Sequence, residues 1–188
     1  MASLVGPAGP FELAPEDVLG ASIPNFVNRT RSLPELLAKS LEFGDREYLV
    51  TKDRKVTFTE HAALVGSLAQ ELRDTYDIQP GDRVAIAAAN SIEWILTFWA
   101  TVGLGGVVVG CNAWWTAKEL EHGLGITQPK VLVADAKRAA LAQEIASEDA
   151  PLPVLSIEED IPRLAAAHPD APAAPFAVNQ IVHRSNVR

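Results

Sequence analysis

The feature that most constrains the fold is a regular alternation of short apolar runs with helical segments in the second half of the chain. Four runs centre about 23 residues apart, at 84–88, 107–109, 131–133 and 154–155. The segments between them have helical character, at 92–104, 117–126 and 136–147. Near-continuous apolar strands that alternate with helices are typical of βαβ units. The sequence therefore predicts an α/β fold, with a mostly parallel sheet and helices on both faces.

Helix starts carry capping signals of the form Ser/Thr-x-x-Glu. In this motif the Ser/Thr side chain accepts a hydrogen bond from the Glu backbone N–H, and the Glu side chain accepts one from the Ser/Thr backbone N–H. The pattern occurs at Ser32 with Glu35, Thr57 with Glu60, and Thr116 with Glu119. A helix is therefore expected from residue 33 to Gly44, and an amphipathic one after Thr57. Between them, 48–51 and 55–58 predict a short hairpin around the turn 52–54.

Composition changes along the chain divide it into three parts. Residues 1–32 are rich in Pro and Gly and predict an extended N-terminal arm. Residues 33–168 hold the hairpin and the alternating pattern, and predict a partial α/β domain. Residues 169–188 read as a Pro/Ala linker followed by a tail.

Charge and cysteine content exclude several functions. The chain has 188 residues and a net charge of −8, and no run of Lys or Arg forms the cluster that nucleic acid binding needs. Cys111 is the only cysteine, so no intrachain disulfide forms, which fits a cytoplasmic protein. We interpret it as a small buried residue at a strand end rather than a nucleophile.

No signal peptide is visible in the sequence. The uncharged stretch 94–111 is interrupted by glycines, which favours a buried helix and strand over a membrane span.

Three motif types yield no site. The glycines of Gly103-Leu104-Gly105-Gly106 follow a helix and precede a strand, the reverse of a dinucleotide-binding loop, so close helix–strand packing is expected. The histidines are scattered and are each expected at the surface, without zinc: His61, His122, His168 and His183. A Gly-x-Ser-x-Gly motif, typical of serine hydrolases, is absent.

A set of segments in order carries a family resemblance. They are Thr57-Phe58-Thr59-Glu60, Gln79-Pro80-Gly81-Asp82-Arg83-Val84, Asn90-Ser91-Ile92-Glu93-Trp94, Gly103-Leu104-Gly105-Gly106, Asn112-Ala113-Trp114-Trp115-Thr116-Ala117-Lys118-Glu119-Leu120 and Lys130-Val131-Leu132-Val133-Ala134-Asp135. Together they resemble the N-terminal region of the adenylate-forming (AMP-binding) superfamily, over roughly residues 33 to 165. The stretch from Asn112 and the segment 23–29 look like the fatty acyl-CoA synthetase branch.

The resemblance implies ligation of a carboxylate, a fatty acid in this branch, to CoA through an acyl adenylate, with ATP and Mg in the complete enzyme. The family's phosphate loop, Thr-Ser-Gly-Thr-Thr-Gly-x-Pro-Lys, does not occur in this sequence, and residues 176–188 do not resemble the family. We therefore expect an N-terminal portion that is inactive alone, with no catalytic or metal-binding residue and no cofactor held by this chain. A frameshifted tail, a fragment and a genuine short form all fit this ending.

Two residue pairs are candidates for ligand contact. Lys137 and Arg138 stand where basic residues of related acetyl-CoA synthetases resemble contacts to the 3′-phosphate of CoA. The alternative interpretation is two solvated charges in the first turn of a helix, where cations are mildly unfavourable. Trp114 and Trp115 fit a ligand platform, but we expect them to pack into the core.

Two rival interpretations of function remain, and the chain is expected to self-associate. A non-catalytic binding or assembly module derived from a ligase half-domain is the first rival, and an unrelated nucleotide-binding α/β domain is the second. We expect the chain to self-associate through residues 1–60 rather than through the βαβ part. The face expected to lack cover is made by Leu33, Leu36, Leu37, Leu41, Tyr48 and Val50.

Overall fold

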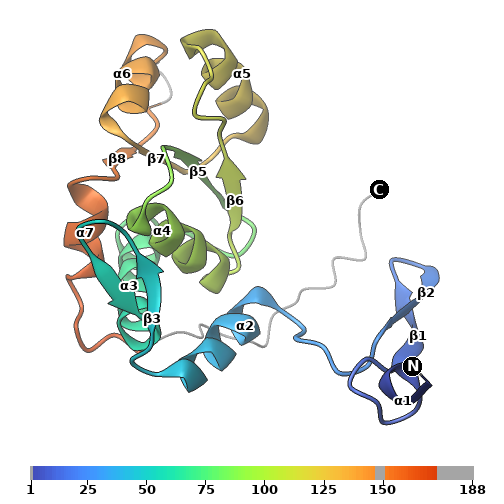
Figure 1. The fold of residues 1–188 in the computed structure, drawn as a ribbon. Helices are drawn as coiled ribbons and strands as arrows, with labels where there is room; N and C mark the ends of the chain where they lie inside the picture. The colour runs from blue at the N-terminus through green and yellow to red at the C-terminus, as the bar shows by residue number, and fades with distance from the viewer. Residues whose placement is uncertain (1, 147–150, 173–188) are drawn as a thin grey trace. The chain divides into compact units, whose positions relative to one another are not determined.

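The computed structural model describes residues 2–146 and 151–172 of the chain (Figure 1). The chain forms two compact units, Met1–Ser32 and Leu33–Arg188. Within the described residues, no helix is long and apolar enough to cross a membrane.

The first unit is a hairpin preceded by one helical turn, α1 (Ala2–Val5). Strands β1 (Leu13–Val18) and β2 (Ala21–Phe26) pair antiparallel, whereas the sequence predicted an extended arm. Two of the prolines that suggested an arm, Pro15 and Pro24, lie directly opposite each other. The Val27 N–H donates to the Glu12 carbonyl, so these two residues form a hydrogen-bonded pair of the ladder. Hydrogen-bonded and non-hydrogen-bonded pairs alternate along an antiparallel hairpin, which makes Pro15 and Pro24 a non-hydrogen-bonded pair. Their missing N–H groups are therefore not needed in the ladder.

The core of the second unit is a four-stranded sheet in the order β6-β5-β7-β8. All three strand pairs are parallel, which confirms the predicted sheet. The strands are β5 (Arg83–Ala87), β6 (Val107–Gly110), β7 (Val131–Ala134) and β8 (Val154–Ser156). Strands β5 and β7 are buried along almost their whole length. This burial explains their unbroken apolar runs.

Helices cover both faces of this sheet, as predicted (Figure 1). Helices α3 (Phe58–Asp74), α4 (Ile92–Gly103) and α7 (Asp160–Ala165) pack on one face, against side chains such as Ile86 and Val133. Helices α5 (Ala117–Thr127) and α6 (Ala136–Glu144) pack on the other face, against Ala85 and Leu132. Helix α6 ends three residues before the predicted residue 147, which lies outside the described residues.

The capping signals act as predicted at two helix starts. Thr57 and Glu60 exchange hydrogen bonds at the start of α3, and Thr116 and Glu119 do so at α5. At α4, the Ser91 hydroxyl accepts a hydrogen bond from the Trp94 N–H. These contacts fix where each helix leaves the preceding loop.

The start of the second unit differs in detail from the prediction. Helix α2 (Leu33–Ser40) is followed by a 3₁₀ turn, η1 (Leu41–Phe43), and Gly44 ends it with φ of 56°. Strands β3 (Glu47–Val50) and β4 (Lys55–Thr57) form the predicted hairpin. Leu37 is buried, so it is not part of the uncovered apolar face that the sequence suggested.

The prediction that every histidine lies at the surface is wrong for His61. Its side chain on α3 is fully buried, and neither ring nitrogen has a hydrogen-bond partner. The ring lies 4.8 Å from Tyr48 and 6.4 Å from Trp99, centroid to centroid. Burial lowers the pKa of His61 to about 4, so the ring is neutral at pH 7. His122 is exposed, His168 is half-buried, and His183 lies outside the described residues.

Candidate functional site

The carboxyl ends of β5, β6 and β7 form the candidate site. The chain leaves β5 toward α4 on one face, and leaves the adjacent β6 and β7 toward α5 and α6 on the opposite face. Neighbouring strands whose connections diverge in this way leave a crevice at their carboxyl ends, where ligands of open α/β sheets bind.

Asp135 connects two of the three loops at this edge. Its Oδ1 accepts the Arg138 N–H at 3.0 Å and so caps α6. Its Oδ2 accepts the Ala89 N–H at 3.0 Å, from the loop after β5. The same oxygen lies 2.7 Å from Nη1 of Arg138. One carboxylate therefore joins the ends of β5 and β7.

Arg138 extends this network to the loop after β6. Its Nε donates to the carbonyl oxygen of Ala113 at 3.0 Å, and its Nη2 donates to the same oxygen. The side chains of Arg138 and Asp135 are each only 13% exposed. Most donors of this guanidinium are thus directed at the protein itself. The geometry gives Arg138 the role of holding three loops together.

Lys137 differs from its neighbour. Its side chain is exposed, and within residues 2–146 and 151–172 it has no hydrogen bond or ion pair. Next to it, the Ala136 N–H donates to Oε1 of Glu158 at 3.3 Å. The start of α6 therefore already faces two carboxylates, those of Asp135 and Glu158, which occupy the backbone donors that a phosphate would use. Of the predicted pair, Lys137 alone has a charge directed at solvent.

The loop after β6 places the two tryptophans differently. Asn112 shapes it, because its Oδ1 accepts the Trp114 N–H at 2.9 Å and its backbone oxygen accepts the Trp115 N–H at 3.1 Å. Trp115 is half-buried and packs against α5, as expected. The prediction that Trp114 packs into the core is wrong: its side chain is 85% exposed. The Asn112 turn and the Arg138 contact hold this exposed indole at the edge of the sheet.

Cys111, which follows β6, is half-buried, whereas the sequence predicted a buried residue. Burial raises the pKa of its thiol to about 11, so the thiolate is scarcely populated at pH 7. Across the described ranges, no group of three or more His, Cys, Asp or Glu side chains gathers as a metal site requires.

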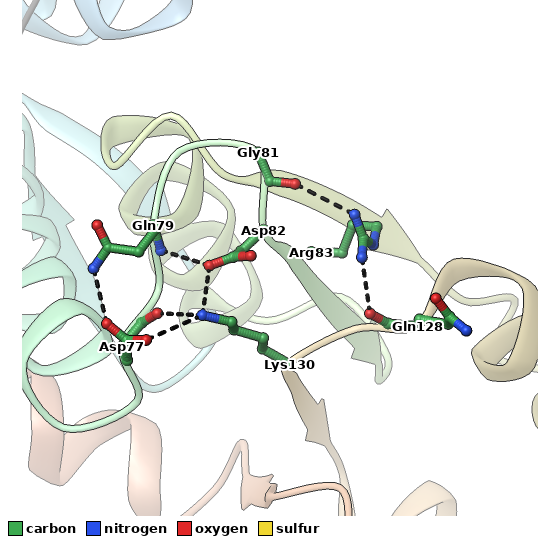
Figure 2. A network of polar contacts seen from close by, with 7 residues as sticks. All are labelled: Asp77, Gln79, Gly81, Asp82, Arg83, Gln128 and Lys130. Atoms are coloured by element: carbon green, nitrogen blue, oxygen red, sulfur yellow. Dashed lines mark hydrogen bonds and ion pairs between the residues drawn. The ribbon is translucent and has the colours of Figure 1, made fainter.

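The opposite, amino edge of the sheet holds a polar network that sequence reasoning missed (Figure 2). Lys130 Nζ lies 2.8 Å from an oxygen of Asp82 and 3.2 Å from one of Asp77, and donates to the Asp77 carbonyl at 2.7 Å. Partial burial would raise the pKa of Asp82, but hydrogen bonds from Lys130 and the Gln79 N–H lower it below its usual value. The hydrogen bond to Asp82 raises the pKa of Lys130. The network joins the turns that precede β5 and β7.

The glycines near this edge serve packing, as the sequence predicted. A Cβ at Gly106 would lie 3.0 Å from the Thr101 carbonyl oxygen and 3.3 Å from that of Asp82. Gly105 has φ of 76°, and its carbonyl accepts the Gly81 N–H at 2.9 Å. They let α4 turn closely into β6, at the edge away from the candidate site.

Comparison with known proteins gives a consistent result. Residues 37–183 match the family model described as AMP-binding enzyme. A medium/long-chain fatty-acid–CoA ligase of Mycobacterium tuberculosis is 29% identical over 143 residues, which cover 74% of this chain and 24% of that protein. The chain thus spans about a quarter of this relative's length.

Solved structures agree at the level of the fold. A fatty acyl-CoA synthetase of Mycobacterium tuberculosis superposes with a TM-score of 0.67 at 26% identity, over 76% of this chain and 30% of that one. The N-terminal domain of FACL13 from the same organism gives a TM-score of 0.68 at 23% identity, over 80% of this chain and 39% of that one.

Proposed function

The chain belongs to the family of AMP-binding enzymes, and we propose that it is the N-terminal part of an ATP-dependent ligase that joins a fatty acid to CoA. The complete reaction converts a carboxylate, ATP and CoA into acyl-CoA, AMP and pyrophosphate through an acyl adenylate. The observation that carries the proposal is the family match over residues 37–183, supported by a parallel sheet shared with a fatty acyl-CoA synthetase. We therefore also propose a role in fatty acid metabolism.

We propose that the 188 residues do not catalyse the reaction by themselves. Adenylation needs donors and cations that stabilise the charge developing on the transferred phosphoryl group. The phosphate loop that carries them in the family does not occur in this sequence. The residues that the structure describes supply a scaffold: a parallel sheet whose carboxyl edge is held in shape by Asp135 and Arg138.

An activity assay tests this proposal. Purified chain is incubated with MgATP, CoA and fatty acids of several lengths, and ATP–pyrophosphate exchange and acyl-CoA formation are measured. We expect neither signal above a protein-free blank. Fatty-acid-dependent AMP release that purifies together with the chain would refute the proposal.

We further propose that Lys137 contacts the 3′-phosphate of CoA, while Arg138 holds the neighbouring loop. The exposure of Lys137 and the internal contacts of Arg138 support this division. NMR titration with CoA and with dephospho-CoA, which lacks the 3′-phosphate, is a direct test. The amide signals of residues 136–138 should shift more with CoA, and Lys137→Ala should remove the difference. Equal shifts with both ligands would argue against the contact.

A non-catalytic binding or assembly module is the second candidate. The observation in its favour is an apolar surface on α2, η1 and β3, where Leu36 is 47% and Val50 is 57% exposed. Stable binding of a partner chain in the absence of nucleotide would favour this module.

We propose a cytoplasmic location for either function, supported by a lone cysteine that fits a reducing compartment. Cell fractionation tests the location.

A further inference from the structure

The hairpin β1–β2 of the first unit is a ribbon of two strands. Among the residues that the structure describes, these strands pair only with each other. A strand edge that has no neighbour carries a row of unpaired N–H and C=O groups, on which a strand of another chain can pair. A two-stranded ribbon has such an edge on both sides.

The register of the hairpin determines which residues face these edges. Starting from the hydrogen-bonded pair Glu12 and Val27, every second pair along the hairpin is non-hydrogen-bonded. In a non-hydrogen-bonded pair, the N–H and C=O groups of both residues point away from the partner strand. The residues whose backbone groups face the two edges are therefore Leu13, Pro15 and Asp17 on β1, and Ser22, Pro24 and Phe26 on β2.

The central position of each edge has no donor. Pro15 and Pro24 occupy these positions, and proline has no backbone N–H. The ring stands where the N–H would donate, so the carbonyl of an incoming strand would stay unpaired there. Both residues are exposed. Because they lie directly opposite each other, this proline pair interrupts both edges at the same level of the hairpin.

The last outward residue of β2 already has partners for its backbone groups. The Phe26 N–H donates to Oδ1 of Asn25 at 3.0 Å, and the Phe26 carbonyl accepts from Nη1 of Arg29 at 3.0 Å. Arg29 is itself held, because its Nη2 lies 2.6 Å from a carboxylate oxygen of Glu16 on β1. Two of the three outward residues of β2, Pro24 and Phe26, therefore offer no donor to a further strand.

We propose that the proline pair prevents strand addition at both edges of the hairpin, and that Asn25 and Arg29 reinforce this block on β2. Prolines and charged side chains protect exposed edges of natural sheets in this way. The hairpin is thereby limited to contacts made by the side chains of its two faces. Self-association through residues 1–60, which the sequence predicts, then proceeds through these faces and not by strand pairing.

Amide hydrogen exchange of the full native chain, followed by NMR, tests whether the edges are free. The N–H groups of Ala14 and Ile23 face the partner strand and should be protected. Those of Leu13, Asp17 and Ser22 should exchange much faster, at rates that do not change with protein concentration. Equal protection of both groups would overturn the proposal, because it would show that another strand pairs with the edges.

Restoring the missing donors tests the role of the proline pair. Pro15→Val opens the β1 edge alone, and two such edges form a closed pair. We therefore expect a dimer that forms at about tenfold lower concentration than any association of the native chain. The double variant Pro15→Val/Pro24→Val opens both edges and should form larger, open-ended assemblies. Sedimentation velocity across a concentration series measures both.

Ala14→Val is the matched control, because it adds a β-branched side chain to the same strand while its N–H already faces β2. It should sediment like the native chain, and circular dichroism verifies that each variant is folded. The proposal fails if Pro15→Val and the double variant associate no more than the native chain, or if Ala14→Val associates as strongly as they do. If the variants do not fold, the exchange pattern of the native chain decides.

Discussion

At the scale of single residues, Arg138 shows how structure changes the meaning of a basic side chain. In sequence it is one of two adjacent cations at a helix start, and both resembled phosphate contacts. In the structure its guanidinium binds Asp135 and the Ala113 carbonyl, whereas Lys137 points its charge at solvent. Sequence alone could not separate them, because the Ala113 carbonyl lies 25 positions away in the chain.

The different roles of these neighbours predict different effects on stability. Arg138→Ala leaves a largely buried carboxylate and a carbonyl without their donor, which should cost about 2–3 kcal/mol of unfolding free energy. Lys137→Ala should change it by less than about 0.5 kcal/mol, as is usual for an exposed side chain. Urea denaturation at pH 7 measures both. Equal effects of the two substitutions would contradict the role assigned to Arg138.

His61 is the residue whose environment differs most from its sequence prediction. The apolar stripe of an amphipathic helix does not include His61, and the sequence predicts a surface position for it. The structure instead buries this ring among Tyr48, Trp99 and the rest of α3. The neutral imidazole is accommodated at this site. A protonated imidazole would lose its hydration there without gaining a hydrogen bond or an opposite charge.

The depressed pKa of His61 predicts acid sensitivity. Its folded value of about 4 lies below the ordinary value of 6.5, so the unfolded chain binds the proton more tightly. Stability is therefore complete above about pH 6.5 and is lost as the pH falls toward 4. Between about pH 7.5 and 4.5 the loss should be about 2–3 kcal/mol. Urea unfolding at both pH values should show this loss in the native chain and not in His61→Phe.

His122→Phe is the control for this comparison, because His122 is exposed on α5. Its pH dependence should match that of the native chain. If His61→Phe kept the full acid sensitivity, another group would be responsible.

At the scale of helices and strands, local signals were enough to predict most of the second unit. The Ser/Thr-x-x-Glu caps of α3 and α5 and the β-branched runs each lie within a few residues of sequence. The hairpin β1–β2 was missed because its prolines normally interrupt strands, and only the pairing of Pro15 with Pro24 makes them harmless. Its two-residue turn has positive φ at both positions, as hairpins favour, but places a leucine at the first of them, with φ of 54° at Leu19 and 84° at Gly20.

Two glycines of α5 give a matched test of its packing. A Cβ at Gly123 would lie 2.7 Å from the Trp115 ring, whereas one at Gly125 would meet nothing within 4 Å. Gly125→Ala should stabilise the chain by about 0.5–1 kcal/mol through helix propensity. Gly123→Ala should instead destabilise it by about 1 kcal/mol or more, because the half-buried indole must move. Thermal unfolding followed by circular dichroism measures both, and stabilisation by both would show that Trp115 is not packed as described.

At the scale of the whole molecule, the parallel sheet and its two helical layers were predictable from periodicity, but function was not. Many activities share such a sheet. The family became recognisable only from an ordered set of weak segments, and the match over residues 37–183 now establishes it. The positions of Arg138 and Trp114 depend on contacts between loops that follow different strands, and periodicity carries no information on these.

The central claim is that this chain is the N-terminal part of a fatty acyl-CoA ligase, and it is tested most directly by the DNA that follows codon 188. Sequencing that region in the source genome and translating it in all three forward frames is sufficient. We predict a segment that encodes the family's phosphate loop, Thr-Ser-Gly-Thr-Thr-Gly-x-Pro-Lys or a close variant. Absence of such a segment from every frame would contradict the claim.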